Sequence, residues 1–342
     1  MENQAQPSNI KQQAVHEIEA FSNRAFVEKE EAITRGFFMK CDKKDQHRKY
    51  IPFTDFIDSD LPRKYRDSDI VGTVKALGDL VVRLEVIKGQ ITELGTGRVK
   101  FSQVHYQNCH CVLCEQLPYI EKPFGTITIV TGTHVVGNSI DAQNTTCLLD
   151  FNNENERSFC VKLKGSRVKV YSDVTDRCEF YCFTYDIGLC INLREKVYSY
   201  NNLNANLNRK YSSNPNANLA IIVAHPHGWC KQVSIGQLLD VHTKPSFKPN
   251  IKLTQYLYNT TTCSGSSGAP LFFLGREKVW TNHPHWGYDE AAQSSFSAYE
   301  IEDVTSNFLS LIKAIKERPN NKTYELINWG QQRPSIKWED EN

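Results

Sequence analysis

The pattern of apolar and polar positions predicts a chain built mainly of short β-strands. Beyond residue 79, brief runs rich in Val, Ile, Thr, Tyr and Phe alternate with Gly, Asn, Asp and Ser, which is typical of strands and turns. Because no helical pattern separates these runs, they favour a β-barrel or β-sandwich over alternating βαβ units. The predicted strands cover 80–87, 97–106, 125–131, 146–150, 158–164, 168–171, 178–184, 219–223, 231–239, 252–258 and 270–273.

Helical patterns are predicted on either side of this region. Over 16–41, scattered apolar residues among many charges favour an amphipathic helix, and the polar stretch 40–69 that follows is predicted to be a solvated connector. Over 301–317, apolar residues recur on one face at helical spacing, and Pro319 ends the pattern. We expect the latter segment to be a helix that docks on the β-rich part.

The chain length and one long polar break suggest how the domain is organised. A chain of 342 residues fits about two domains or one two-lobed domain, and the polar segment 201–217 is predicted to link two β-barrels. We therefore expect an N-terminal helical, charged extension over 1–77, a double-barrel domain over 78–318 and a polar tail over 319–342. Within the domain, the first barrel covers about 78–200, the second about 218–300, and the docking helix 301–317.

Composition and charge limit the partners and the compartment. Lys and Arg number 40 against 39 Asp and Glu, so the net charge of +1 argues against nucleic acid held mainly through phosphates. No apolar run approaches a signal peptide or a membrane span, which predicts a protein of the cytoplasm or nucleus without a membrane partner. Eleven cysteines cannot all pair with one another, and in that compartment we expect reduced thiols.

One serine lies in a loop suited to nucleophilic catalysis. In the segment TTCSGSSGAPLF, Ser267 is flanked by glycine, and its own N–H and that of Gly265 could point to one spot as an oxyanion hole requires. The alternative is a plain Gly/Ser turn before a strand. Upstream, His134 ends a predicted strand, and Asp186 precedes an apolar–polar alternation that we interpret as another strand. The order His134, Asp186, Ser267 favours a catalytic triad.

These segments resemble those of chymotrypsin-like serine proteases. TGTHVV is similar to the T-A-x-H-x-V strand end of that family, YDIGLCINL to D-I-A-L-L-x-L, and SGSSGAPLF to G-x-S-G-x-P. LGTGRV and VAHPHGWCKQVSIG resemble segments of the HtrA-like branch, and the run of His285, Trp286 and Gly287 resembles the strand that lines the primary specificity pocket. The resemblance covers about residues 79–290, with six motifs in the family's order.

The resemblance implies two antiparallel six-stranded β-barrels and a serine endopeptidase acting on polypeptides through an acyl-enzyme. Ser267 would attack the scissile carbonyl, His134 would carry the proton, and Asp186 would orient the imidazole, without a required cofactor. Ser266 replaces the acid that pairs with a newly cut N-terminus in digestive members, so activation by such a cut is not expected. Thr261 replaces the pocket-floor acid of trypsin, which favours a neutral side chain at the cleaved position; His285 would narrow the pocket, titrate, or face solvent.

Three alternatives stay open. A catalytically silent protease fold could serve as a binding or scaffold protein, with the N-terminal extension binding a partner or autoinhibiting. A zinc-organised interaction protein could instead use His105, Cys109, Cys111 and Cys114, although reduced loop cysteines or a redox or disulfide role fit the same run. The third, an α/β-hydrolase, is disfavoured because Pro270 and the apolar run after Ser267 fit a strand and not the helix that fold requires.

Other cysteines and histidines have plainer interpretations. Cysteines at 178, 182 and 190 are expected to fill the core as small apolar residues, and Cys263 is not placed to replace the serine nucleophile. His225 and His227 bracket a proline in a predicted turn. We expect them to shape that loop, with substrate contact as the alternative.

Overall fold

The computed structural model describes residues 41–106, 123–173, 175–214, 216–245, 251–276, 284–289, 293–303 and 337–338. The chain forms two compact units, 1–45 and 46–342. In the described part of the first unit, the Lys44 N–H donates to the Cys41 carbonyl at 3.2 Å. The helix predicted over 16–41 lies almost wholly outside the described residues. All the described strands belong to the second unit.

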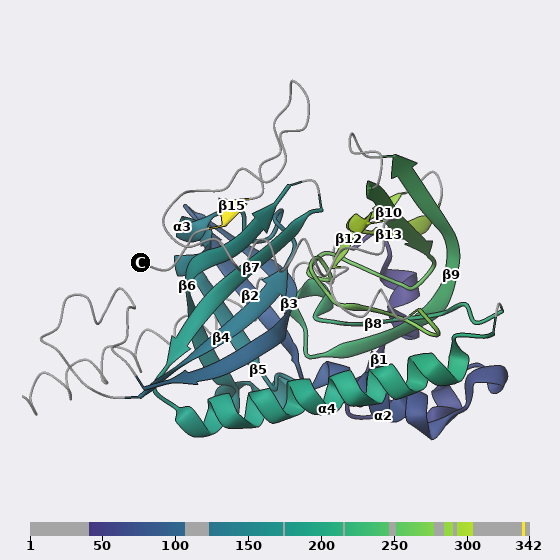
Figure 1. The fold of residues 1–342 in the computed structure, drawn as a ribbon, viewed down its shortest axis with the longest axis horizontal. Helices are drawn as coiled ribbons and strands as arrows, with labels where there is room; N and C mark the ends of the chain where they lie inside the picture. Colours follow the sequence, from purple (N-terminus) through teal and green to yellow (C-terminus); the bar gives the residue numbers. More distant parts are fainter. Residues whose placement is uncertain are drawn as a thin grey trace, which may run out of the picture. The chain divides into compact units, whose positions relative to one another are not determined.

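Strands make up most of the regular secondary structure described in the second unit (Figure 1). Its α-helices are α2 (Ser68–Gly78), α3 (Ser139–Gln143) and α4 (Ile187–Tyr211), and the short 3-10 helices are η1 (Lys44–Lys49, which begins in the first unit), η2 (Asp58–Asp60), η3 (Arg63–Tyr65), η4 (Glu154–Phe159) and η5 (Pro226–Gly228). The strands are β1 (Ile51–Pro52), β2 (Val81–Lys88), β3 (Ile91–His105), β4 (Phe124–Thr131), β5 (Thr145–Leu149), β6 (Val161–Ser172), β7 (Arg177–Thr184), β8 (Leu219–Ala224), β9 (Gln232–Pro245), β10 (Ile251–Tyr258), β11 (Leu271–Phe273), β12 (His285–Asp289), β13 (Ser294–Ser297), β14 (Glu300–Asp303) and β15 (Lys337–Trp338).

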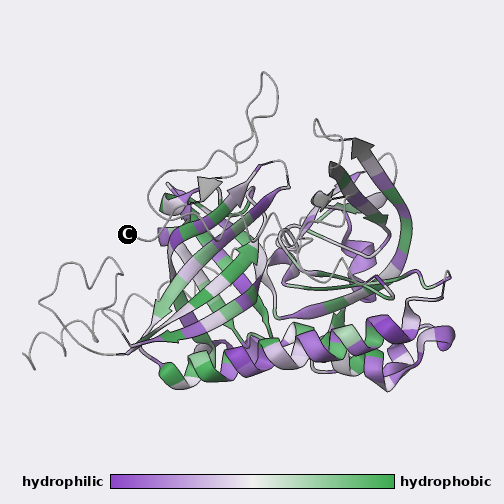
Figure 2. Ribbon diagram, in the orientation of Figure 1, coloured by the Kyte–Doolittle hydropathy of each residue, from purple (hydrophilic) through white to green (hydrophobic). Residues whose placement is uncertain are grey.

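The first six long strands close into a barrel. Antiparallel pairing runs in the order β6-β5-β2-β3-β4-β7, and β6 pairs with β7 to complete the ring. The short strand β15 also pairs with β6, at Val170 and Tyr171. Hydrophobic and hydrophilic positions alternate along much of these strands in Figure 2, as expected when one face of a strand lies in an apolar core. Strand β4 and most of β2 are buried on both faces. The buried face includes Leu84, Ile127, Ile129 and Phe180. The prediction of a six-stranded antiparallel barrel is therefore confirmed for the first half of the fold.

The second half forms another antiparallel sheet, in the order β11-β8-β9-β10-β13-β12, with β1 paired to β9 and β14 to β10. Its two end strands approach each other just before they begin, because Pro270 and Pro284 form a single antiparallel bridge. Among the described residues, β11 and β12 form no continuous ladder beyond this bridge. A mainly β protein with one closed barrel and a second sheet is consistent with a chymotrypsin-like fold, and a closed second barrel stays a prediction.

The connection between the two sheets is a helix, which corrects two predictions. The segment interpreted as a strand after Asp186 and most of the segment interpreted as a polar linker over 201–217 belong to the 25-residue helix α4. Its buried apolar residues, Cys190, Leu193, Tyr200 and Leu207, recur at intervals of three, seven and seven residues, as on one face of a helix. Figure 1 shows α4 running beneath both sheets, beside α2, which it contacts.

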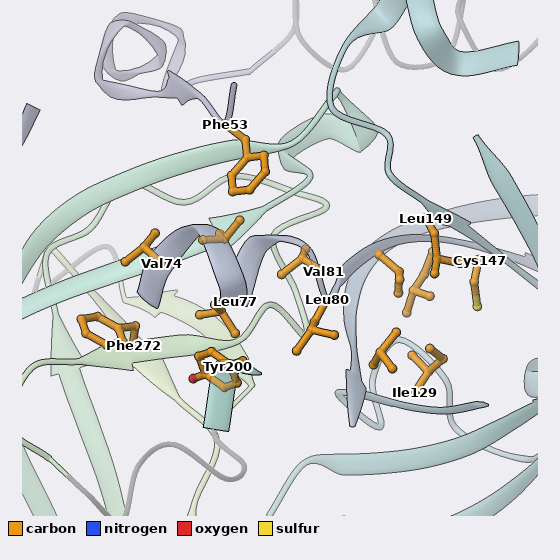
Figure 3. Packing of buried hydrophobic residues seen from close by; sticks show 14 of the residues in the cluster. Phe53, Val74, Leu77, Leu80, Val81, Ile129, Cys147, Leu149, Tyr200 and Phe272 are labelled. Atoms are coloured by element: carbon orange, nitrogen blue, oxygen red, sulfur yellow. The ribbon is translucent and has the colours of Figure 1, made fainter. Parts of the chain in front are cut away.

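The larger of two described apolar clusters continues from the barrel to the second sheet, and the smaller one lies within the second sheet. Leu77 of α2, Leu80 just after that helix and Tyr200 of α4 all belong to the larger cluster and lie close together in Figure 3. This cluster extends into the second sheet through Ile221 of β8 and Phe272 of β11. Because the apolar side chains on both sides are at most a few per cent exposed, the two sheets are expected to unfold together.

The C-terminal part differs from the sequence-based expectation where it is described. Residues 300–303 form strand β14 on β10 instead of starting the predicted docking helix, and the rest of that helix lies outside the described residues. Within the described chain, no helix has the length and apolarity needed to cross a membrane. Cys178, Cys182 and Cys190 are buried, as predicted for small core residues.

One fully buried cation provides a stability prediction. Lys231 is inaccessible to solvent, with Nζ 4.8 Å from the centre of the Phe53 ring, and burial lowers the pKa of Lys231 to about 8 despite the nearby carboxylates of Asp150 and Asp79. Below pH 8 the folded protein holds a charge that is more favourable in the unfolded chain, at a cost of roughly 3 kcal/mol. Between pH 8 and 10.5 the unfolded chain binds more protons, so this penalty falls as the pH rises.

We therefore expect Lys231→Met to raise the free energy of unfolding by up to about 3 kcal/mol at pH 7, and the advantage to shrink towards pH 10.5. Urea denaturation of both proteins at pH 7 and pH 10 measures the two differences. Lys196→Met, at a lysine that is partly exposed and 3.7 Å from Asp150, is the matched control and should show little change. An advantage of Lys231→Met that is equal at the two pH values would contradict the prediction.

Candidate active site

His134 is held by a buried carboxylate, and that carboxylate is Asp176. Strands β4 and β7 pair with Thr131 opposite Cys178, so continuing the register by two residues sets Thr133 opposite Asp176. The His134 Nδ1 and Asp176 Oδ2 atoms are 2.7 Å apart. Asp176 Oδ1 accepts from the His134 backbone N–H at 3.1 Å and from the Thr133 hydroxyl at 2.7 Å. The sheet register thus brings the acid to the histidine.

These contacts fix the chemistry of the imidazole. The Asp176 side chain is 5% exposed and that of His134 is 33% exposed, so the acid is enclosed while the base is accessible. A carboxylate at Nδ1 favours the tautomer with the proton on Nδ1, which leaves Nε2 as the basic nitrogen. Asp176 also has a φ of 42°, a left-handed conformation that aspartate tolerates better than most residues and that is found at functional sites.

Asp186, the acid predicted from the sequence, has a different role. Its side chain accepts from the Leu189 N–H at 2.8 Å and caps the N-terminus of α4, and the residue is exposed. Aspartate is among the best N-cap residues, so an acid immediately before an apolar pattern is also a helix signal. The predicted pairing of His134 with Asp186 is therefore wrong: the carboxylate that contacts His134 belongs to Asp176. The sequence signal for Asp176 was its place two residues before the predicted strand 178–184.

Strand β3 brings the loop of Ser267 towards the segment of His134. The Thr96 N–H donates to the Ser267 carbonyl at 2.8 Å, and the Thr96 hydroxyl donates to the Gly265 carbonyl at 2.7 Å. A β-carbon placed on Gly95 would lie 2.6 Å from Val135 Cγ1 and 3.5 Å from the Ser267 carbonyl oxygen. The neighbour of His134 and the backbone of Ser267 thus pack against the same glycine. Between the two described side chains themselves, the structure forms no hydrogen bond.

A second loop fixes the backbone of the candidate oxyanion hole. The His227 N–H donates to the Ser264 carbonyl at 2.5 Å, and the Ser266 N–H donates to the Cys263 carbonyl at 2.9 Å. Gly265 has a φ of 89°, and a β-carbon there would lie 2.6 Å from the His225 carbonyl oxygen. Among the described residues, neither the Gly265 N–H nor the Ser267 N–H donates to a backbone carbonyl.

The glycine after Ser267 gives a prediction about this packing. Gly268 has a φ of 81°, and a β-carbon there would clash with the Thr131 hydroxyl and the Thr96 carbonyl. Gly89 has a similar φ of 64° but nothing within 4 Å of such an atom, so Gly89→Ala is a matched control. Gly89→Ala should cost about 1 kcal/mol through φ alone, and Gly268→Ala about 2 kcal/mol more through the clash. Urea denaturation compares the two, and equal losses would contradict the close packing.

The predicted pocket residues lie beside this loop. The Gly268 N–H donates to the His285 carbonyl at 2.9 Å, and the His285 N–H donates to the Ala269 carbonyl at 2.8 Å. His285 is buried, with Nδ1 2.6 Å from the Tyr258 hydroxyl, which replaces the expectation of a solvent-facing histidine. Thr261 is also buried, whereas Trp286 is 37% exposed and packs edge-on against Phe296, the ring that Gly287 faces. Burial raises the pKa of Tyr258, so its hydroxyl stays neutral.

Side chains of types that can bind a metal ion gather at the start of the Ser267 loop. His47, His227 and Cys263 converge so that their ligand atoms are within 4.8 Å of one another and could hold a metal ion. Burial, and then the neighbouring His47, lower the pKa of His227 to about 4, and burial lowers that of His47. Sequence inspection missed this group because its members are far apart in the chain.

The zinc cluster predicted from the sequence is described only at His105. There Nε2 lies 2.8 Å from the Thr126 hydroxyl, and the ring stacks on Phe124. Cys109, Cys111 and Cys114 lie outside the described residues. His225 has the structural role expected for it: it is buried, its Nδ1 lies 2.8 Å from the Trp229 carbonyl, and its N–H donates to the Thr96 hydroxyl.

Comparison with known proteins gives matches only at the level of solved structures. No protein family model matches the chain, and no curated protein matches it. Among the similar structures is the Rv3671c protease from M. tuberculosis in its active form, at 12% identity and a TM-score of 0.38, covering 73% of this chain and 86% of that one. The HtrA-type protease AlgW has the same identity and TM-score, with 72% and 63% covered. The serine endoprotease from Yersinia pestis shows 12% identity and a TM-score of 0.36, with 72% and 66% covered. Similarity this low does not carry a function over to this chain.

Proposed function

We propose that this protein is a serine endopeptidase that uses Ser267 as nucleophile, His134 as general base and Asp176 as the residue that orients and stabilises the imidazole. The observation that carries the proposal is the buried Asp176 carboxylate, 2.7 Å from His134 Nδ1, beside a loop that offers Ser267. A structural histidine does not need a buried carboxylate with three hydrogen bonds. This arrangement of an oriented base next to a glycine-flanked serine is the one that nucleophilic catalysis requires.

The residues then divide the reaction between them. As Ser267 Oγ attacks the carbonyl carbon of the substrate, His134 Nε2 takes the hydroxyl proton, and Asp176 stabilises the imidazolium that forms. His134 then returns the proton to the leaving amine. In the second half of the reaction, His134 takes a proton from the water that attacks the acyl-enzyme and returns it to Ser267 Oγ. The hydrogen bond between Ser267 and His134 is expected to form when substrate closes the site, since such bonds are often long in free enzymes.

The N–H groups of Gly265 and Ser267 are the proposed oxyanion donors. Both belong to a loop whose carbonyls at 264 and 265 are held by His227 and Thr96, so the donors are fixed before the reaction begins. Donors that need no reorganisation are the ones that stabilise a developing negative charge best. For substrate selection, we propose that the buried, uncharged surroundings of Thr261 and His285 accept a neutral side chain at the cleaved position.

Digestion of a peptide mixture tests the proposal. The full chain is incubated with a proteome-derived peptide library, and new termini are counted by mass spectrometry against the Ser267→Ala protein. New termini made by the wild type alone, with neutral residues before the cut, support the proposal. Identical peptide populations in the two reactions, with wild-type protein that is folded, would favour the catalytically silent binding protein instead.

A further inference from the structure

A second cluster of polar side chains lies at the loop of residues 263–268, which carries Gly265 and Ser267 and is called here the candidate oxyanion loop. His47 comes from η1, His227 from η5, and Cys263 from the loop itself, four residues before Ser267. The Nε2 atoms of the two histidines are 3.2 Å apart, and His47 Nε2 is 3.4 Å from Cys263 Sγ. Three separate backbone segments thus direct two imidazoles and a thiol to one point.

Hydrogen bonding alone does not explain this convergence. The Nε2 of a neutral imidazole has one in-plane position, which is either one N–H or one lone pair, yet His47 Nε2 has two polar atoms at contact distance. A metal ion placed among the three atoms would contact all of them. Around tetrahedral zinc, with Zn–N of ~2.0–2.1 Å and Zn–S of ~2.3 Å, neighbouring ligand atoms are about 3.3–3.6 Å apart. The separations of 3.2 Å between the two Nε2 atoms and 3.4 Å between His47 Nε2 and Cys263 Sγ are close to these distances.

The ligand types favour zinc among divalent ions. Thiolate and imidazole together are the usual ligands of structural zinc, whereas magnesium and calcium prefer oxygen.

We propose that His47, His227 and Cys263 bind a structural zinc ion that holds the candidate oxyanion loop in place. The backbone around the site is already constrained: His227 has a φ of 57°, its N–H donates to the Ser264 carbonyl, and Gly265 packs against the same turn. An ion held by two imidazoles and a thiolate from three backbone segments organises the loop.

The proposal is tested by the metal content of the full chain, purified without chelator and also reconstituted with zinc. We expect one zinc per chain, and cobalt in its place should give the strong visible bands of tetrahedral coordination. His227→Asn, which keeps a residue that tolerates the left-handed backbone, and Cys263→Ser should each weaken zinc binding more than about 100-fold, because even changes next to metal ligands cost about 10–100-fold.

The controls separate this site from other thiols and histidines. Cys230→Ser, at a half-buried cysteine outside the group, and His242→Gln, at an exposed histidine, should keep one zinc. So should a triple Cys→Ser variant at positions 109, 111 and 114. Zinc that survives both His227→Asn and Cys263→Ser, zinc lost only in the triple variant, or no zinc in the reconstituted wild type would each overturn the proposal. The metal content of the wild type and of its cobalt form stands even where a variant fails to fold, and it does not depend on peptidase activity.

Discussion

Ser267→Ala is expected to lower kcat/KM for peptide hydrolysis by about 10⁴-fold or more while leaving the fold intact, because it removes the nucleophile and little else. Ser267 is half-buried, and its backbone contact with Thr96 uses the carbonyl, which alanine retains. The measurement is the initial rate on a peptide cleaved by the wild type, with thermal unfolding as the check on folding.

Ser264→Ala is the matched control for this variant. Ser264 is an exposed serine in the same loop, and its role in holding His227 also comes from its carbonyl. Its rate should stay within a few-fold of the wild type. A Ser264→Ala protein that loses as much activity as Ser267→Ala, or a Ser267→Ala protein that keeps its activity, would remove Ser267 from the nucleophile role.

Asp176→Asn is expected to lower kcat/KM by about 10⁴-fold, while Asp186→Asn leaves it nearly unchanged. An amide at 176 can no longer hold the Nδ1 proton of His134 and stabilise the imidazolium, so the base is left in the wrong tautomer. At 186, asparagine caps a helix as well as aspartate does, so α4 and its packing are retained. The rates of the two variants on the same peptide decide between the two acids.

Either reversal of this pair is informative. A large loss in Asp186→Asn with an active Asp176→Asn would restore the acid chosen from the sequence and contradict the hydrogen bonds of His134. Losses in both variants, accompanied by lowered thermal stability in Asp186→Asn, would point to a contribution of the α4 N-terminus to folding. Circular dichroism of each variant distinguishes that outcome from a catalytic one.

Most of the β-structure could be predicted from residue patterns because strands alternate with a period of two, whichever strands they pair with. Nine of the eleven predicted runs overlap one strand each, and the other two, 158–164 and 168–171, are parts of the continuous strand β6. The pattern broke there because Gly165, Ser166 and Arg167 interrupt the apolar sequence. In the structure Gly165 is buried against the Ala142 carbonyl, and a side chain there would not fit.

Helix α4 could not be recognised from its first turns. Ile187, Leu189, Ile191 and Leu193 alternate like a strand, and the helical period shows only when Tyr200 and Leu207 are included. The polar residues Asn204 and Asn208, which are buried on the same face, hide that period further. This error also led to the wrong acid, because Asp186 was interpreted as the residue before a strand.

For the candidate site, sequence could identify residues whose neighbours carry the signal but not their partners in space. Ser267 and His134 stand in short motifs with recognisable flanks. Asp176 reaches His134 through the pairing of β4 with β7, and His47 reaches Cys263 across more than 200 positions of the chain, a contact set by tertiary packing. Register and long-range packing depend on the whole fold, so one sequence does not reveal them.

Mapping a fluorophosphonate adduct tests whether Ser267 is a nucleophile activated by His134. The full chain is treated with the reagent, and intact mass and peptide mapping locate the modified residue. We expect one adduct per chain, on Ser267, and none in the Ser267→Ala or His134→Ala proteins. A folded wild-type protein that takes up no reagent, or an adduct that persists in Ser267→Ala, would contradict it.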